Sequence, residues 1–266
     1  MQGFDPDKDL VKNEEMILLD RWIVSKTFDL QHNIITEYNN YNFHFVMKSI
    51  LNFCTNDLGG FYLDIIKDRQ YTTQADSLAR RSAQSALFHI SHAMVRWLSP
   101  ILSFTAEEIW QFLPGVSKES VFLQTWYEDL KGNFDNKAIE TARDINTQIR
   151  KELEEMRQNK VIGSSLDAEV DIYCSQENFQ ALLELKNELR FVFITSEANL
   201  YDLNDIPTDA NEIDSELSIR VRKSDHQKCV RCWHHRPEIG ENKNYVDLCG
   251  RCIENVSGEG EHRIFA

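Results

Sequence analysis

The stretch KCVRCWHHRPEIGENKNYVDLCGRC, residues 228–252, holds two Cys-x-x-Cys pairs separated by sixteen residues. Each pair offers two sulfurs from one short turn, and the segment between the pairs folds back so that four thiolates surround one tetrahedral ion. We therefore predict one structural Zn2+. Four protein thiolates leave no open position for water or substrate, so this metal shapes the segment and takes no part in chemistry. The predicted ligands are Cys229, Cys232, Cys249 and Cys252.

Two alternatives to zinc are a pair of disulfides and a redox dithiol. Disulfides need an oxidising compartment, whereas the chain shows no signal-peptide pattern, because charged and polar residues dominate from Asp5 to Glu15. A redox dithiol would need one pair opening a helix in a thioredoxin-like unit. Cys54 and Cys174 lie far apart in apolar-flanked segments, where we expect small buried hydrophobes.

Composition predicts a soluble protein with real hydrophobic cores. The 266 residues are 42% hydrophobic and 11% aromatic, which suffices for about two domains. No apolar run is long enough to span a membrane, so we expect a cytoplasmic protein without a membrane partner.

The net charge of -14 argues against a polyanionic partner, because nucleic-acid affinity rests on Lys and Arg. The charge is nevertheless uneven. Residues 191–218 hold seven acidic and no basic residues, whereas residues 219–237 hold six basic residues and one acidic residue. Regional charge decides what a surface binds. The zinc segment is thus a basic tip, and whether it binds a partner or only keeps the segment soluble stays open at this point.

Residues 13 to 113 are helical in pattern, with apolar stripes at three-, four- and seven-residue steps. The Gly59-Gly60 pair predicts a bend or helix break, and Thr105 to Glu108 fits a capping box that opens a short helix. Short connections between such helices predict a bundle. We expect three tryptophans and two histidines to be structural parts of this bundle: Trp22, Trp97, Trp110, His89 and His92.

After Gly115 the pattern changes to a small α/β module. Residues 137–160 predict a charged helix and residues 179–189 a further one, while residues 168–174, 191–194 and 217–221 predict strands. An acidic stretch around residues 204–214 is expected to link this module to the zinc segment. The predicted fold is mainly α: a helical bundle over 1–125, a helix plus small α/β linking module over 126–218, and a four-cysteine zinc finger over 219–266.

Several long strings resemble one enzyme family. KCVRCWHH, LCGRC and NVSGEGEHRIFA are similar to the carboxy-terminal zinc domain of bacterial isoleucyl-tRNA synthetases. LDRWIVSK, YNFHFVMKSILNFCTNDLGGFYLDIIKDRQY and RRSAQSALFHISHAMVRWLSPILSFTAEEIW resemble the helical anticodon-binding domain of the same class I synthetases. RQNKVIGSSLDAEVDIY and ELRFVFITS resemble the module that joins them. The resemblance covers nearly the whole chain.

The resemblance implies a carboxy-terminal fragment of a larger ligase that uses ATP to attach isoleucine to its tRNA in protein biosynthesis. The HIGH-like and KMSKS-like signatures and the editing domain are missing, so no catalytic residue is expected here, and ATP and Mg2+ would bind only in the absent catalytic domain. The implied partner is the anticodon stem-loop of isoleucine tRNA. We expect a monomer and no binding to DNA.

The resemblance also suggests tRNA contacts. Its KDR-x-Y string predicts that Lys67 and Arg69 face the anticodon loop. Trp233 offers either a stacking face for an unstacked base or a hydrophobic plug. Arg231 and Arg251 each precede a zinc-binding Cys and either contact phosphate or offset the thiolate charge. The weaker candidates, a basic pair at the start of a helix, are Arg80 and Arg81.

Two rival interpretations belong to other classes. A DNA-repair glycosylase of the formamidopyrimidine type has a related four-cysteine finger, but it needs an amino-terminal catalytic proline and a β-rich first domain. A zinc-ribbon scaffold for protein interactions is favoured by the acidic body. A binding constant that falls with salt more steeply for tRNA than for duplex DNA would separate tRNA recognition from both.

Overall fold

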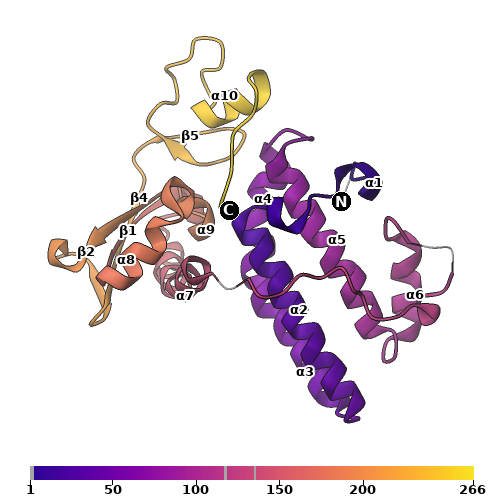
Figure 1. The fold of residues 1–266 in the computed structure, drawn as a ribbon. Helices are drawn as coiled ribbons and strands as arrows, with labels where there is room; N and C mark the ends of the chain where they lie inside the picture. Colours follow the sequence, from indigo (N-terminus) through magenta and orange to yellow (C-terminus); the bar gives the residue numbers. More distant parts are fainter. Residues whose placement is uncertain (1–2, 117–118, 135) are drawn as a thin grey trace. The chain divides into compact units, whose positions relative to one another are not determined.

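The computed structural model describes residues 3–116, 119–134 and 136–266 (Figure 1). The chain packs into two compact units. The first consists of Met1–Leu63 and Ala75–Asp135, and the second of Asp64–Gln74 and Asn136–Ala266. The zinc segment and the α/β module, which the sequence assigned to separate domains, therefore share one unit. The boundaries at residues 125 and 218 stay predictions of functional domains.

The first unit is a helical bundle, as predicted. Its long helix α2 (Leu18–Asn39) buries one apolar stripe that includes Leu19, Ile23 and Ile34. This stripe packs against α3 (Phe43–Asn52) and α5 (Leu78–Leu98), because three- and four-residue spacing places apolar side chains on one helix face (Figure 1). The remaining helices of the unit are α1 (Pro6–Asp9) and α6 (Ser103–Phe112), with 3-10 turns at Asn13–Glu15 and Val121–Leu123.

Of the bend or helix break predicted at the glycine pair, the break is wrong. A π-helical segment, Phe53–Tyr62, carries the helix from α3 into α4 (Leu63–Thr72) without interruption. A Cβ atom on Gly59 would lie 3.0 Å from the carbonyl oxygen of Cys54, and one on Gly60 would lie 2.8 Å from that of Thr55. Glycine is thus needed because the wider π turn brings the backbone too close for a side chain.

Two buried polar side chains at the centre of the first unit, Asp20 and Trp97, have hydrogen-bond partners. The carboxylate of Asp20 accepts hydrogen bonds from Tyr62 Oη at 2.7 Å and Ser82 Oγ at 2.5 Å. Trp97 Nε1 donates to Gln31 Oε1 at 2.9 Å. The prediction that three tryptophans belong to the core is confirmed, since each is at most 2% exposed: Trp22, Trp97 and Trp110.

The predicted capping box is also wrong. Helix α6 begins at Ser103, and its N-cap residue Leu102 makes no side-chain cap hydrogen bond, so Thr105 lies inside the first turn. The Glu107 carboxylate instead accepts from the backbone N–H of Val121 at 3.0 Å and from Ser120 Oγ at 2.8 Å. The box does not form because the helix begins two residues before Thr105, which leaves Thr105 in a helical and not an N-cap position.

The second unit contains a four-stranded sheet in the order β2-β1-β4-β3, with bounds Ala168–Cys174 (β1), Glu197–Asp202 (β2), Asn211–Asp214 (β3) and Leu217–Lys223 (β4). Strand β1 runs parallel to β2 and antiparallel to β4. Helix α7 (Lys137–Gln158) packs against β4, and α8 (Gln176–Leu183) against β1 and β2. The predictions of α7, β1 and β4 are confirmed.

Two expectations for this unit are wrong. Residues 191–194 form no strand: Leu189–Phe193 is helix α9, which ends at Ile194 in the left-handed conformation, with φ of 56°. The four apolar residues are compatible with a helix as well as a strand, since periodicity cannot distinguish so short a run. The acidic stretch is no linker, because it forms the 3-10 turn Leu203–Asp205 and edge strand β3.

The zinc segment follows β4 directly. A two-stranded hairpin, β5 (Gln227–Lys228) with β6 (His235–Arg236), encloses the first cysteine pair. The second pair lies at the start of α10 (Gly250–Ser257), whose N-cap residue is Cys249.

Candidate functional site

The four predicted cysteines converge. Their sulfur atoms all lie within 4.8 Å of one another and are buried. Cys232 Sγ and Cys249 Sγ are 3.6 Å apart. Zn–S bonds of about 2.3 Å in a tetrahedron separate the sulfurs by roughly 3.8 Å. The donor set therefore fits zinc, and four buried thiolates need such a cation because they cannot share so small a volume as bare anions.

Backbone hydrogen bonds shape the first cysteine turn. The N–H of Cys229 donates to the carbonyl oxygen of His234 at 2.9 Å, and the N–H of Trp233 donates to that of Cys229 at 2.9 Å. The N–H of Cys249 points at Cys229 Sγ, 3.4 Å away, which links the two pairs. Since the sulfurs form most of the segment's buried core, with Ile239, metal and fold are coupled.

Trp233 is displayed at the surface by this turn. Its side chain is 61% exposed, which excludes the hydrophobic-plug alternative within the described structure. Its φ of 68° lies in the left-handed region, which is unusual for a bulky residue. The turn thus holds a flat aromatic face outward at a cost in backbone strain.

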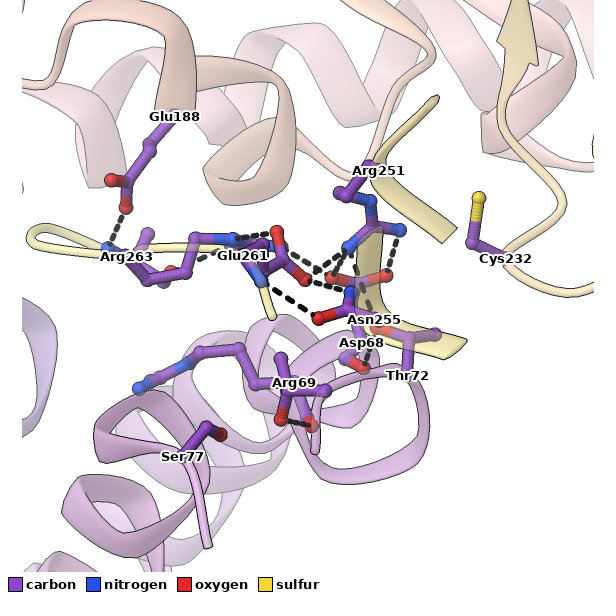
Figure 2. A network of polar contacts seen from close by, with 12 residues as sticks. Asp68, Arg69, Thr72, Ser77, Glu188, Cys232, Arg251, Asn255, Glu261 and Arg263 are labelled. Carbon is purple, nitrogen blue, oxygen red and sulfur yellow. Dashed lines mark hydrogen bonds and ion pairs between the residues drawn. The ribbon is translucent and has the colours of Figure 1, made fainter. Parts of the chain in front are cut away.

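Arg231 and Arg251 differ in position. Arg231 Nη1 donates to the carbonyl oxygen of Thr72 at 2.6 Å and lies 3.9 Å from Cys252 Sγ, as expected of a residue that offsets thiolate charge. Arg251 makes a two-pronged ion pair with Asp68 at 2.6 and 2.9 Å (Figure 2). Only 9% of the Arg251 side chain is exposed, so this geometry gives no support to its predicted phosphate contact.

The α4 candidates also separate. Lys67 is exposed and pairs with Asp64 at 2.8 Å. Arg69 is 0% exposed, which is at odds with the prediction that it faces the anticodon loop. A string match identifies the helix but not which of its faces is outward.

Arg80 and Arg81 belong to the first unit, at the start of α5. Arg81 pairs with Asp9 at 3.2 Å and donates to the carbonyl oxygen of Gly3 at 2.8 Å. The Arg81 guanidinium is therefore held by an acidic residue of helix α1.

A cavity of about 800 Å³ lies within the second unit, next to the zinc segment. Apolar side chains from α7, α9 and the adjoining loop line its walls, among them Leu153, Ile162 and Phe193. Sequence reasoning missed Tyr71 and Arg150 as lining residues; the KDR-x-Y string contains Tyr71, which is 78% exposed. The full set of its cationic and large aromatic lining residues is Lys67, Tyr71, Arg150, Arg157, Phe191, Phe193, Arg231 and Trp233.

The other titratable groups that the sequence singled out are structural. His89 Nδ1 lies 2.8 Å from Tyr127 Oη, and burial lowers the pKa of His89 to about 4. His92 Nε2 lies 2.9 Å from the carbonyl oxygen of Pro114, and burial lowers its pKa as well. Both predictions are confirmed. Cys174 is buried as expected, with its pKa raised to about 11 by burial, while Cys54 is half-buried.

Two family models match the chain. The anticodon-binding domain of tRNA ligase matches residues 20–172, and the zinc finger found in FPG and IleRS matches residues 227–255. Across the described ranges, no helix combines the length and the apolar character that crossing a bilayer requires.

Curated relatives match along the whole chain. An isoleucine–tRNA ligase of Ruthia magnifica subsp. Calyptogena magnifica is 58% identical over 266 residues, covering 100% of this chain and 29% of that protein. The isoleucine–tRNA ligases of Idiomarina loihiensis and Pseudomonas aeruginosa PAO1 are 48% and 50% identical, each covering 100% of this chain and 29% of the relative. The chain thus spans about three-tenths of the length of these relatives.

Proposed function

This chain belongs to the anticodon-binding domain family of tRNA ligases, and we propose that it recognises the anticodon stem-loop of isoleucine tRNA as part of an isoleucine–tRNA ligase. One observation carries the proposal: an anticodon-binding domain over residues 20–172 is followed in the same chain by a zinc finger of the kind found in FPG and IleRS. Neither the scaffold nor the glycosylase alternative is favoured, because neither accounts for the first match.

The whole ligase would attach isoleucine to its tRNA with ATP and Mg2+, acting as a monomer in the cytoplasm. This chain contributes recognition and not catalysis, since it matches an anticodon-binding domain. Zn2+ would be held by the four clustered thiolates and would fix the basic tip, supplying structure only.

The RNA surface would combine exposed cations with exposed flat side chains. RNA loops are read where bases are splayed out, and stacking on aromatic rings needs an accessible face. Trp233 and Tyr71 have such faces, while the exposed Lys67 and the partly buried Arg231 supply positive charge beside them. In the first unit, the proposed contacts are Arg80 and Arg81. Arg69 and Arg251, being buried, would act from inside the fold.

Binding of an RNA hairpin that carries the isoleucine anticodon stem-loop tests the proposal. We expect the 266-residue chain to prefer this hairpin to one with a replaced anticodon, with affinity falling as salt rises. The charge reversal Lys67→Glu should weaken binding and reduce the slope of log affinity against log salt by about 1.

The matched control is Lys151→Glu, which reverses an exposed charge on α7 away from the cavity lining. It should leave hairpin affinity nearly unchanged. Equal affinity of the wild-type chain for both hairpins and for duplex DNA would refute anticodon recognition by this chain. Unchanged affinity in Lys67→Glu at low salt would remove Lys67 from the surface.

A further inference from the structure

Resting on the proposed function, we infer that Asp68 is a positioning residue for RNA recognition. It does not touch RNA itself. It holds the zinc segment against α4, so that the aromatic and cationic side chains of both elements form one surface.

Asp68 is one of four side chains that form a closed ring of alternating positive and negative charges. Its carboxylate receives Arg251 at 2.6 and 2.9 Å and Arg263 at 2.6 Å. Glu261 completes the ring, pairing with Arg251 at 3.1 Å and Arg263 at 2.8 Å (Figure 2). Asn255 Nδ2 donates to the same Glu261 carboxylate at 2.9 Å. Each guanidinium therefore contacts both carboxylates, and the four charges sum to zero.

The ring is buried, so removing one member leaves the others uncompensated. The Arg263 side chain is 2% exposed. Burial alone would raise the pKa of Asp68, but the guanidiniums of Arg251 and Arg263 outweigh burial and hold that pKa well below its usual value. The Phe191 ring lies under Arg263, with 3.3 Å between the guanidinium carbon and the ring centroid. A buried ion pair that loses one partner is strongly destabilised, so the position of the zinc segment depends on Asp68.

Helix α4 has two adjacent faces, one that holds the zinc segment and one that is exposed to solvent. Residues four apart lie on the same helix face. Asp68 and Thr72 share one face, and the carbonyl oxygen of Thr72 receives Arg231 at 2.6 Å. Lys67 and Tyr71 share the adjacent face, and both are exposed.

The face with Asp68 and Thr72 thus holds two arginines of the zinc segment. Each precedes the second cysteine of its pair: Arg231 and Arg251. Trp233 follows the first of these pairs directly. Lys67 and Tyr71, on the exposed face of α4, line the same cavity as Trp233. Loss of Asp68 should therefore displace Trp233 from Lys67 and Tyr71 while leaving the four cysteines, which the ring does not include, able to bind metal.

The test is a double-mutant cycle in the 266-residue chain, read by hairpin binding. Asp68→Asn should weaken binding to the anticodon hairpin about tenfold and narrow its preference over the hairpin with a replaced anticodon. In a Trp233→Ala background the same substitution should change affinity less than about twofold, because the side chain that Asp68 positions is already gone. Zinc content and the absorption spectrum of the cobalt-substituted protein should stay unchanged. The control is Asp144→Asn, the same chemical change at an exposed site on α7.

A purely structural role would give the same fold-loss with and without Trp233, and that result would overturn the inference. If Asp68→Asn does not fold, Arg263→Lys keeps the charge but removes the forked geometry and serves in the same cycle. Absence of any anticodon preference in the wild-type chain would overturn the proposed function and this inference with it. Preference in the wild type that Asp68→Asn fully retains would overturn the inference alone.

Discussion

Acid should destabilise the helical bundle through His89. Burial lowers the pKa of this imidazole to about 4, an effect opposed by Asp129 and reinforced by His92 and Lys131. In the unfolded chain its pKa returns to about 6.5. Between these values the unfolded state binds a proton that the folded state does not, so stability falls as pH falls from about 6.5 to about 4 and is fully present above that window.

The size of the effect follows from the shift. A difference of about 2.5 pKa units corresponds to roughly 3 kcal/mol in total, of which about 2 kcal/mol is lost between about pH 7 and about pH 5. The pKa of His92 is lowered in the same direction, so the whole bundle loses more than this. The His89 share is isolated by His89→Asn, which keeps a polar atom near Nδ1 for Tyr127 but does not titrate.

Urea unfolding followed by tryptophan fluorescence measures this loss. Four of the five tryptophans lie in the first unit, so a Trp233→Phe background makes the signal report on that unit alone. We expect His89→Asn to be less stable than wild type at neutral pH but to lose about 2 kcal/mol less on acidification to about pH 5. The control His32→Asn changes an exposed histidine on α2. Equal acid sensitivity in His89→Asn and wild type would refute the assignment.

Three further predictions concern the metal, the π-helical segment and the strained turn. Chelation should unfold residues 227–255, seen as rapid hydrogen exchange there, with bundle fluorescence unchanged; retained protection would show that the segment folds without metal. Gly60→Ala should cost about 1 to 3 kcal/mol in urea unfolding, because its Cβ would meet the carbonyl oxygen of Thr55; a neutral result would mean that the π turn yields easily. Trp233→Asn should stabilise the second unit by about 1 kcal/mol by relieving its backbone and weaken hairpin binding by about 1 to 3 kcal/mol. Unchanged hairpin affinity would exclude stacking on Trp233.

What the sequence predicted well has a local or periodic signal. The stripe of α2, the alternation of β1 and the cysteine spacing each specify a structure within a short window. What it predicted badly depends on competition between structures that share a pattern. The apolar stripe of a helix has the same spacing whether a glycine pair breaks the helix or widens it into a π turn. The apolar run at 191–194 is compatible with a strand, but in the structure it ends helix α9, with Ile194 in the left-handed conformation.

The candidate site divides in the same way. Metal ligands follow from spacing, but exposure of an arginine depends on partners that are remote in sequence. Asp68 meets Arg251 and Arg263 across 183 and 195 residues, and no local pattern announces such a pairing. The KDR-x-Y string therefore located the candidate residues on α4 but did not indicate that Arg69 is buried and Tyr71 exposed.

The Glu188 side chain holds residues 264–266 by hydrogen bonds to their backbone N–H groups. The Glu188 carboxylate accepts the backbone N–H groups of Ile264, Phe265 and Ala266 at 2.9, 3.0 and 2.8 Å. A carboxylate that binds only amides is indifferent to the side chains those amides carry, with the exception of proline, which has no N–H. Natural variation and mutational scans should therefore find Ile264, which is about half exposed, open to most residues, whereas the neighbouring Arg263 admits almost none.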